Sequence, residues 1–386
     1  MSITAAQGFR ASGVVAGLKS TGKPDVAVVV NDGPHHHAAA VFTANRVAAA
    51  PVRWSRQVLA DGRVDAVVLN SGGANAATGA EGFQQSHATA EHAAQLLGVS
   101  AGDVVVCSTG LIGVPLPMDR LLPGVAAGVQ ALDGDGGYAA AEAIMTTDTR
   151  PKNAVHEGPG YRIGGMAKGA GMLAPGMATM LCVITTDAVL PPAELDAFLR
   201  EAVRTTFDRT DSDGCMSTND TVVLLSSGAS GTTPEPGEFQ EGLRAVCADL
   251  ARQLIGDAEG AAHDISIQVV NATTEEAAEA VARAVSRSNL FKTAVFGQDP
   301  NWGRVISAVG TVPEEVAPFD ADQLDVTFNG VQVCRAAGVG EDRELVDLTA
   351  REVEVLIDLH AGAASATIWT NDLTHDYVHE NSAYSS

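Results

Sequence analysis

Basic side chains are scarce in this chain. Its 386 residues include 24 Lys and Arg against 47 Asp and Glu, which gives a net charge of −23. A nucleic-acid-binding protein needs a basic face to neutralise phosphates, and a polybasic membrane anchor needs clustered Lys and Arg. The charge balance therefore argues against nucleic-acid and membrane partners.

Long apolar runs and paired cysteines are also lacking. No run reaches the roughly 18 residues that a membrane-spanning helix needs. The N-terminus has no basic start followed by an apolar core, so we expect no signal peptide. The five cysteines are odd in number, widely spaced and without a CxxC pair. This pattern predicts buried free thiols in a reducing cytoplasm.

Aromatic residues make up only 4% of the chain, whereas glycine is abundant at 40 residues. Small side chains must therefore fill much of the interior. With 46% apolar and 18% charged residues, the composition is that of a globular protein, and the length corresponds to two or three domains.

Short apolar runs bounded by turn residues predict strands. They lie at Val26–Val30, Ala66–Leu69, Val104–Cys107, Met180–Thr185, Val222–Leu225, Ile265–Val270, Asp325–Val333 and Arg351–Leu359. Helical spacing or an Ala-rich composition predicts helices over Gly82–Leu97, Leu195–Ala202, Phe239–Leu254 and Ala277–Val285. The segments 134–137 and 228–237 predict loops. Strands mixed with helices, without a regular βαβ alternation, predict an α+β layered fold.

The most unusual segment is Gly164–Thr186, in which a glycine-rich loop enters an apolar strand at Thr179. Such a loop could deliver the Thr179 hydroxyl to the carbonyl of Ala178, and hydrolysis of the resulting ester would make Thr179 a new N-terminus. Its free α-amine, with an ordinary pKa of about 7.7–8.0, could then act as the base for its own hydroxyl. The spacing alone leaves a second interpretation open, in which Thr179 is a β-branched strand residue.

Other polar segments favour structural roles. His35–His37 have no partner acid or cysteine at metal-ligand spacing, so we expect a polar loop and no metal. We interpret Asp299 and Arg304 as part of a structural turn that supports the site. The chain has neither GxxxxGK[ST] nor GxSxG, so a P-loop ATPase or an ordinary serine hydrolase is not indicated.

Several segments, in order along nearly the whole chain, resemble the ornithine acetyltransferase family, the self-cleaving glutamate N-acetyltransferases of arginine biosynthesis. They are CSTGLIG at Cys107–Gly113, MTTDTRPK at Met145–Lys152, KGAGMLAPGMATML at Lys168–Leu181, STNDT at Ser217–Thr221, GDAEGA at Gly256–Ala261, FGQDPNWGR at Phe296–Arg304 and the terminal HENSAYSS. The sequence departs from the family pattern at Gly73, Ala77, Gly176 and Ser386. These changes touch neither the nucleophile nor the oxyanion pair.

The resemblance implies a role for each matching residue. Thr179 matches the nucleophile, with cleavage between Ala178 and Thr179, and Thr109 and Gly110 match the pair that stabilises the oxyanion. The remaining matches are to substrate-binding positions: Thr146 (or Thr147, with Thr146 preferred), Lys168, Glu259, Asn381 and Ser386.

The resemblance also implies a layered α/β sandwich with a second, smaller C-terminal α/β domain. The activity expected is ping-pong transfer of acetyl from N2-acetyl-L-ornithine to L-glutamate in the cytoplasm, with acetyl-coenzyme A as a possible second donor. No metal or organic cofactor is expected. The cleaved fragments, 1–178 and 179–386, should stay interlocked, usually as an α2β2 assembly.

Two rival functions remain open at this point. A self-processing hydrolase of the N-terminal-nucleophile type, such as an amidase or aminopeptidase, would share Thr179 and the oxyanion pair but admit water. An uncleaved, non-catalytic protein could use the same glycine-rich loops to bind an amino acid.

Overall fold

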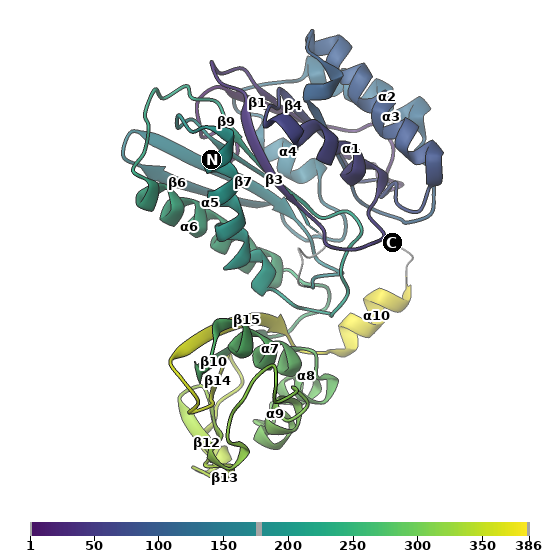
Figure 1. Cartoon of the computed structure of the whole chain (residues 1–386). Coiled ribbons are helices and arrows are strands. Elements are labelled where there is room, and N and C mark those ends of the chain that lie inside the picture. The colour runs from purple at the N-terminus through teal and green to yellow at the C-terminus, as the bar shows by residue number, and fades with distance from the viewer. Residues whose placement is uncertain (1, 175–179, 384–386) are drawn as a thin grey trace.

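The chain folds into two lobes joined near residue 263. The structure is a computed structural model and describes residues 2–174 and 180–383. Figure 1 shows the larger first lobe above the smaller C-terminal lobe, with the last helix extending from the C-terminal lobe toward the first. The expected α+β layered fold with a smaller C-terminal α/β unit is confirmed.

Two sheets form the centre of the first lobe. Among the described residues, one has four strands in the order β1-β2-β4-β5 and the other has five in the order β3-β9-β8-β7-β6. The strands of the first sheet are β1 (Phe9–Val14), β2 (Val26–Asn31), β4 (Ala66–Asn70) and β5 (Val104–Ser108). Those of the second are β3 (His37–Phe42), β6 (Lys152–Gly158), β7 (Tyr161–Lys168), β8 (Leu181–Thr186) and β9 (Thr221–Ser226). The five runs predicted as strands in this lobe are confirmed.

Helices flank the two sheets. They are α1 (Ala50–Val58), α2 (Gly79–Leu97), α3 (Met118–Gln130), α4 (Gly137–Ala143), α5 (Pro192–Arg204) and α6 (Pro236–Ile255). The buried residues of α4 join the core between the sheets. Buried residues of α2 and α3 pack on the four-stranded sheet, and those of α5 and α6 pack on the five-stranded sheet. The two sheets pack on each other through a shared core. The lobe is therefore a four-layer sandwich, helix–sheet–sheet–helix.

The layering explains why the strands read as unbroken apolar runs. Along β2, Val26 and Val28 join the core beneath the helices, whereas Ala27 and Val29 join the core between the sheets. A strand that is buried on both faces has no polar side and shows no alternation.

The register of the five-stranded sheet places three chain segments at one edge. Lys168, the last residue of β7, pairs with Leu181 at the start of β8. Leu181 also pairs in parallel with Thr221, the first residue of β9. The start of β8 at Leu181 therefore lies beside the end of β7 and the start of β9.

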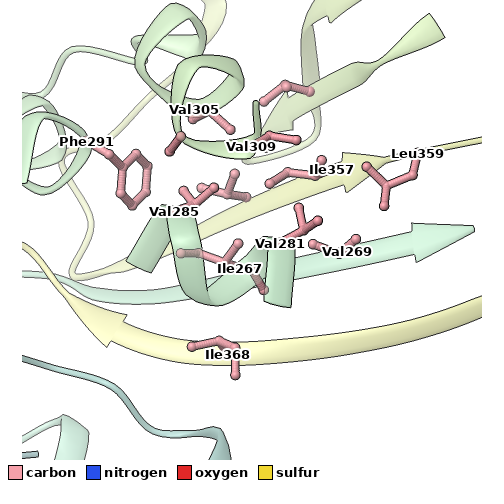
Figure 2. Packing of buried hydrophobic residues seen from close by; sticks show 14 of the residues in the cluster. Ile267, Val269, Val281, Val285, Phe291, Val305, Val309, Ile357, Leu359 and Ile368 are labelled. Carbon is pink, nitrogen blue, oxygen red and sulfur yellow. The ribbon is translucent and has the colours of Figure 1, made fainter. Parts of the chain in front are cut away.

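The C-terminal lobe is a six-stranded sheet, counted over the described residues, in the order β13-β12-β11-β14-β10-β15. Its strands are β10 (Asp264–Ala272), β11 (Asp325–Phe328), β12 (Val331–Arg335), β13 (Gly338–Val339), β14 (Glu352–Asp358) and β15 (Ala364–Asn371). The helices are α7 (Glu275–Ser286), α8 (Asn289–Phe296), α9 (Trp302–Val309) and the extending α10 (His375–Ala383). Figure 2 shows Val281 of α7 and Val309 of α9 packed over Ile267, Ile357 and neighbouring strand residues.

Some expectations for this lobe were wrong in detail. The run 325–333 is a hairpin of two strands because Asn329 and Gly330, with φ of 45° and 84°, turn the chain between β11 and β12. The Asp299–Arg304 segment does form a turn. However, Arg304 Nη1 contacts the carbonyl of Leu290 on α8, so this turn holds α8 to α9 within the C-terminal lobe.

The cysteines and apolar helices agree largely with expectation. Cys107, Cys182, Cys247 and Cys334 are free and buried, but Cys215 is free and exposed. In the described part of the chain, no helix combines the length and apolar character needed to cross a bilayer.

Candidate functional site

A cleft at the edge of the five-stranded sheet gathers the described residues that the sequence predicted as functional. Its empty volume, counted out to the mouth, is about 590 Å³. The predicted residues that line it are Thr109, Gly110, Thr146, Thr147, Lys168, Glu259 and Asn381. Ala178, Thr179 and Ser386 lie outside the described residues.

Thr109 and Gly110 directly follow β5 and are fixed by neighbouring backbone. The Thr109 N–H donates to the Asn70 carbonyl at 2.9 Å, and the Thr109 carbonyl accepts the Gly73 N–H at 3.0 Å. Gly110 has a φ of 129°, and a Cβ there would lie 2.7 Å from the Gly73 nitrogen. Only glycine fits this backbone. Among the described residues no group accepts the Gly110 N–H.

Lys168 brings a buried cation to the same place. It is 1% exposed, and its Nζ donates to Thr109 Oγ1 at 3.3 Å. Burial lowers the pKa of Lys168, with Lys152 adding to this, while Asp148, Asp220 and Glu259 oppose it. Lys168 is therefore the buried last residue of a core strand, whereas most lysines in proteins are exposed.

The two threonines after α4 have different partners. The Thr147 hydroxyl donates to Glu259 Oε1 at 2.7 Å. The Thr146 N–H donates to Asp148 Oδ2 at 2.9 Å, while its hydroxyl lies 3.4 Å from the same oxygen. The Thr146 hydroxyl is therefore less strongly engaged and more available to a ligand than that of Thr147.

A buried ion-pair network lies beneath these threonines. Lys152 Nζ lies 2.6 Å from both Asp148 Oδ1 and Asp257 Oδ2. Asp148 Oδ1 also accepts the Gly169 N–H at 2.7 Å. Although burial opposes ionisation, Lys168 and Lys152 lower the pKa of Asp148 to about 2. Asp148 thus stays charged and links Thr146 to the residue beside Lys168.

The approach to β9 supplies residues to which the sequence assigned no role. Asn219 Nδ2 donates to the carbonyls of Ala74 and Ser108 at 2.6 and 2.8 Å, which ties together two loops of the cleft wall. Asp220 is fully buried, and its Oδ1 accepts the Met180 N–H at 2.9 Å. Burial raises the pKa of Asp220 well above its usual value. In the sequence, the signal that could have identified Asn219 and Asp220 was the polar run STNDT directly before an apolar strand.

The C-terminal helix closes one side of the cleft. Asn381 of α10 lines it, and its Nδ2 donates to the Tyr377 carbonyl at 3.0 Å. The base of α10 is fixed because the Thr374 hydroxyl donates to the Gly260 carbonyl and accepts the Tyr377 N–H. A Cβ on Gly260 would lie 2.2 Å from the Tyr377 nitrogen, so the helix packs tightly on the turn that carries Glu259.

Within the described residues, neither a cluster of metal-ligating side chains nor a reactive Cys107 thiol is found at the cleft. No three His, Cys, Asp or Glu side chains gather there as metal ligands. His37 Nδ1 instead contacts the Leu190 carbonyl at 2.8 Å. Burial raises the pKa of Cys107, which lies two residues before Thr109, to about 12. This thiol is therefore protonated and inert at neutral pH.

Comparison with known proteins gives consistent matches. Residues 10–386 match the ArgJ family. The proteins named arginine biosynthesis bifunctional protein ArgJ from Streptomyces coelicolor and Thermobifida fusca are 64% and 62% identical over the whole of both chains. A solved ornithine acetyltransferase from Mycobacterium tuberculosis, complexed with ornithine, is 54% identical, with a TM-score of 0.45 over 47% of this chain and 96% of its own. A solved ArgJ protein from Bacillus halodurans is 33% identical, with a TM-score of 0.49 over 52% of this chain and 97% of its own.

Proposed function

Since this chain belongs to the ArgJ family of bifunctional arginine-biosynthesis enzymes, we propose that its cleft transfers an acetyl group from N2-acetyl-L-ornithine to L-glutamate. As a member of the ArgJ family, the chain is an acetyltransferase. The observation that supports this assignment of the site is the convergence of Thr109, Gly110 and Lys168 in one cleft, with Lys168 paired to the first residue of β8.

The proposed nucleophile is Thr179, released by self-cleavage after Ala178. Both ends of the segment that contains the cut are anchored, since Ala174 and Met180 are buried. The Met180 N–H, one residue after the nucleophile, is held by Asp220. After cleavage the α-amine of Thr179 would be the base for its own hydroxyl.

The oxyanion would be stabilised by the Thr109 hydroxyl and the Gly110 N–H. Because Lys168 Nζ donates to Thr109 Oγ1, the Thr109 hydroxyl hydrogen is free to point into the cleft. Donors of this kind contribute roughly 3–4 kcal/mol each to acyl transfer. The same donors would serve both the self-cleavage and the acetyl transfer, since each passes through a tetrahedral oxyanion.

The two half-reactions can use one pocket. The Thr179 hydroxyl attacks the amide carbonyl of acetylornithine, the C–N bond breaks, and the α-ammonium gives a proton to the departing amine. The glutamate amine then attacks the ester carbonyl, and the C–O bond to Thr179 breaks. The α-amine takes the proton from the attacking amine and passes it to the Thr179 oxygen, so acetylglutamate leaves and the free hydroxyl is restored. Donor and acceptor share an α-carboxylate, which suits the Lys168 cation, whereas Glu259 suits an ammonium group. Thr146, Asn381 and Ser386 are proposed to complete substrate binding.

The proposal also covers how the two fragments assemble, where the protein acts and which second donor it uses. We expect fragments 1–178 and 179–386 to remain together, as an α2β2 particle in the cytoplasm. Acetyl-coenzyme A is proposed as a second acetyl donor, and no metal or organic cofactor is required by the chemistry described.

Mass measurement of the purified protein tests this function. We expect two fragments, the second starting at Thr179, and a gain of one acetyl group on that fragment after brief exposure to acetylornithine. Thr179→Ala should leave a single uncut chain without transferase activity, because the nucleophilic hydroxyl is lost. Thr179→Ser, which keeps a hydroxyl, is the matched control.

Three results would contradict the proposal. One is normal turnover by the Thr179→Ala variant. Another is an active protein that is never cut, which would favour a simple binding protein. The third is accumulation of acetate instead of acetylglutamate, with ornithine released no faster when glutamate is present, which would indicate a hydrolase.

A further inference from the structure

A second hollow adjoins the cleft and shares part of its wall. Its empty volume, counted out to the mouth, is about 1410 Å³. Gly110 and Thr146 line both spaces. The outer wall of the hollow is the loop that carries Lys19 and Lys23.

The distribution of lysines singles out this loop. The chain has five lysines. Three of them, Lys152, Lys168 and Lys292, are buried. The other two are Lys19, which is half-buried, and Lys23, which is exposed. In a chain of net charge −23, both lysines that reach solvent thus lie on the rim of one hollow.

Neither rim lysine has a carboxylate ion-pair partner within the described residues. Lys19 Nζ donates instead to the Pro24 carbonyl at 2.8 Å. The nearby carboxylate of Asp25 accepts the N–H groups of Ala16, Leu18 and Lys19. Asp25 therefore shapes the loop by binding its backbone.

Neither of the two carboxylates that line the hollow forms a described ion pair with Lys19 or Lys23. Asp148, which also lines it, is bound to Lys152, and Glu142 is exposed on the rim. Burial lowers the pKa of Lys19 to about 8, and Lys168 and Lys23 add to this lowering while Asp25 and Asp148 oppose it. A bound anion would supply the missing countercharge.

Close backbone packing connects the lysine loop to the oxyanion donors. A Cβ on Gly72 would lie 2.2 Å from Leu18 Cβ, and a Cβ on Gly110 would lie 2.7 Å from the Gly73 nitrogen. The lysine loop, the Gly72–Gly73 turn and Gly110 are therefore stacked in contact. A ligand that lies over Gly72 has one end near the lysines and the other near Gly110.

We propose that this hollow binds the phosphate-bearing end of an acetyl thioester, with Lys19 and Lys23 contacting the phosphates and the acetyl group reaching Gly110. The proposal rests on the proposed function and gives the second donor, acetyl-coenzyme A, a binding site of its own. The Thr179 oxygen attacks the thioester carbonyl and the C–S bond breaks. The thiol leaves with the proton that the α-amine took from the hydroxyl. The acetyl-threonine that results is the one formed from acetylornithine.

The test compares two acetyl donors in four proteins. These are the wild type, K19Q/K23Q, the charge-keeping K19R/K23R, and R335Q as a control that removes a basic residue in the C-terminal lobe. For K19Q/K23Q we expect kcat/KM with acetyl-coenzyme A to fall at least tenfold through KM, with turnover of acetylornithine unchanged. The arginine variant and R335Q should behave as the wild type does. Added salt should raise the wild-type KM for acetyl-coenzyme A, because it screens exposed charges, and should affect K19Q/K23Q much less.

Calorimetric titration with coenzyme A itself separates the two proposals. Binding by the wild type that is lost in K19Q/K23Q supports the hollow, even if no acetyl transfer is found. Equal coenzyme A affinity in the wild type and K19Q/K23Q overturns it. A wild type that uses acetylornithine but neither binds coenzyme A nor uses its acetyl ester also overturns it, and leaves the proposed function standing.

Discussion

Asp220 shows how much a single side chain can add to the cleft. It is fully buried, its Oδ1 holds the Met180 N–H, and its Oδ2 has no hydrogen-bond partner among the described residues. Burial raises its pKa well above the usual value, although the Met180 N–H, Ser217 and Lys168 oppose the shift. A neutral carboxyl group has nearly the same shape as the amide of asparagine. Replacing Asp220 with asparagine therefore tests whether the carboxyl group is charged.

We expect D220N to keep self-cleavage within a few-fold of the wild type, because the amide oxygen can still accept the Met180 N–H. D220A should slow self-cleavage at least tenfold, since the start of β8 loses its anchor. The appearance of the two fragments, followed by mass measurement after synthesis in vitro, gives both rates. Equal slowing of D220N and D220A would mean that the ionised form is required.

The protonation of Asp220 also predicts a pH dependence of stability. In the unfolded chain this carboxyl ionises near pH 4, and burial raises its pKa well above that value in the folded chain. The folded state then binds more protons, so the contribution of this group to stability falls as the pH rises above about 4. Relative to the parent, D220N should therefore become more stable between pH 4 and 7. Urea unfolding in the uncut Thr179→Ala background measures this difference, and a difference that stays flat with pH would show that Asp220 is ionised in the fold.

Gly110 allows a second test at this scale. Gly110→Ala should reduce both self-cleavage and acetyl transfer by roughly a hundredfold or more, the loss expected for one oxyanion donor. The reason is that the new Cβ would displace the Gly73 backbone. Gly113→Ala is the matched control, since its φ is also positive, at 85°, but its Cβ would meet nothing within 4 Å. Similar losses in both variants would assign the effect to backbone strain alone.

At the scale of elements, the ion pair beneath the cleft joins the start of β6 to the turn after α6. Lys152 is fully buried between Asp148 and Asp257. Removing one partner of a buried pair leaves an uncompensated charge in the interior. The pair therefore acts as a rigid support for Thr146 and Gly169, both of which it holds through Asp148.

We expect Lys152→Met to lower the free energy of unfolding by about 3–5 kcal/mol. Arg200→Met, which breaks the exposed pair with Asp196 on α5, should cost less than about 1 kcal/mol. Urea unfolding of both variants in the uncut background gives the two values. Losses of similar size would mean that the Lys152 pair is solvated rather than buried.

The elements that the sequence predicted are those with uninterrupted apolar runs or clean helical spacing. Strands such as β7, which contains Gly164 and Gly165, and the Ala-rich β3 were missed because their side chains are too small to form a hydrophobic pattern. Close packing explains the glycines, since a Cβ on Gly164 would lie 2.4 Å from the Ser2 carbonyl oxygen. The β11–β12 hairpin was missed although Asn-Gly is a strong turn signal.

The candidate site was predicted from ordered family motifs, and its supporting contacts were not. Residues that a motif named do converge on the cleft, as far as the structure describes them. The Lys152 network joins residues 105 positions apart, and no local pattern could reveal that pairing. Lys19 and Lys23 were passed over for the same reason, since their closeness to Gly110 arises only through the stacked loops.

At the scale of the whole molecule, the five-stranded sheet interleaves the two proposed fragments. β8 and β9, which follow residue 179, lie between β3 and β7, which precede it. Each fragment alone would expose the edges of strands that are fully buried in the sheet. The fragments therefore share one core instead of meeting at a surface.

We expect the cut protein to show two bands on a denaturing gel and one species on gel filtration, at the elution volume of the uncut Thr179→Ala variant. The two bands should stay together at any dilution that leaves the fold intact, because β8 and β9 cannot leave without breaking the sheet. Separation of the fragments under native conditions would contradict this arrangement.

From the order β3-β9-β8-β7-β6 we also expect the proposed maturation to be a one-way event. The precursor can fold as a single molecule because a covalent link tethers Ala174 to Met180. Once the proposed cut is made and the sheet has opened, the same strands must find each other as two separate solutes, and their encounter slows as they become more dilute. The working lifetime of the mature protein is then governed by how fast the sheet opens, not by an equilibrium that could repair it.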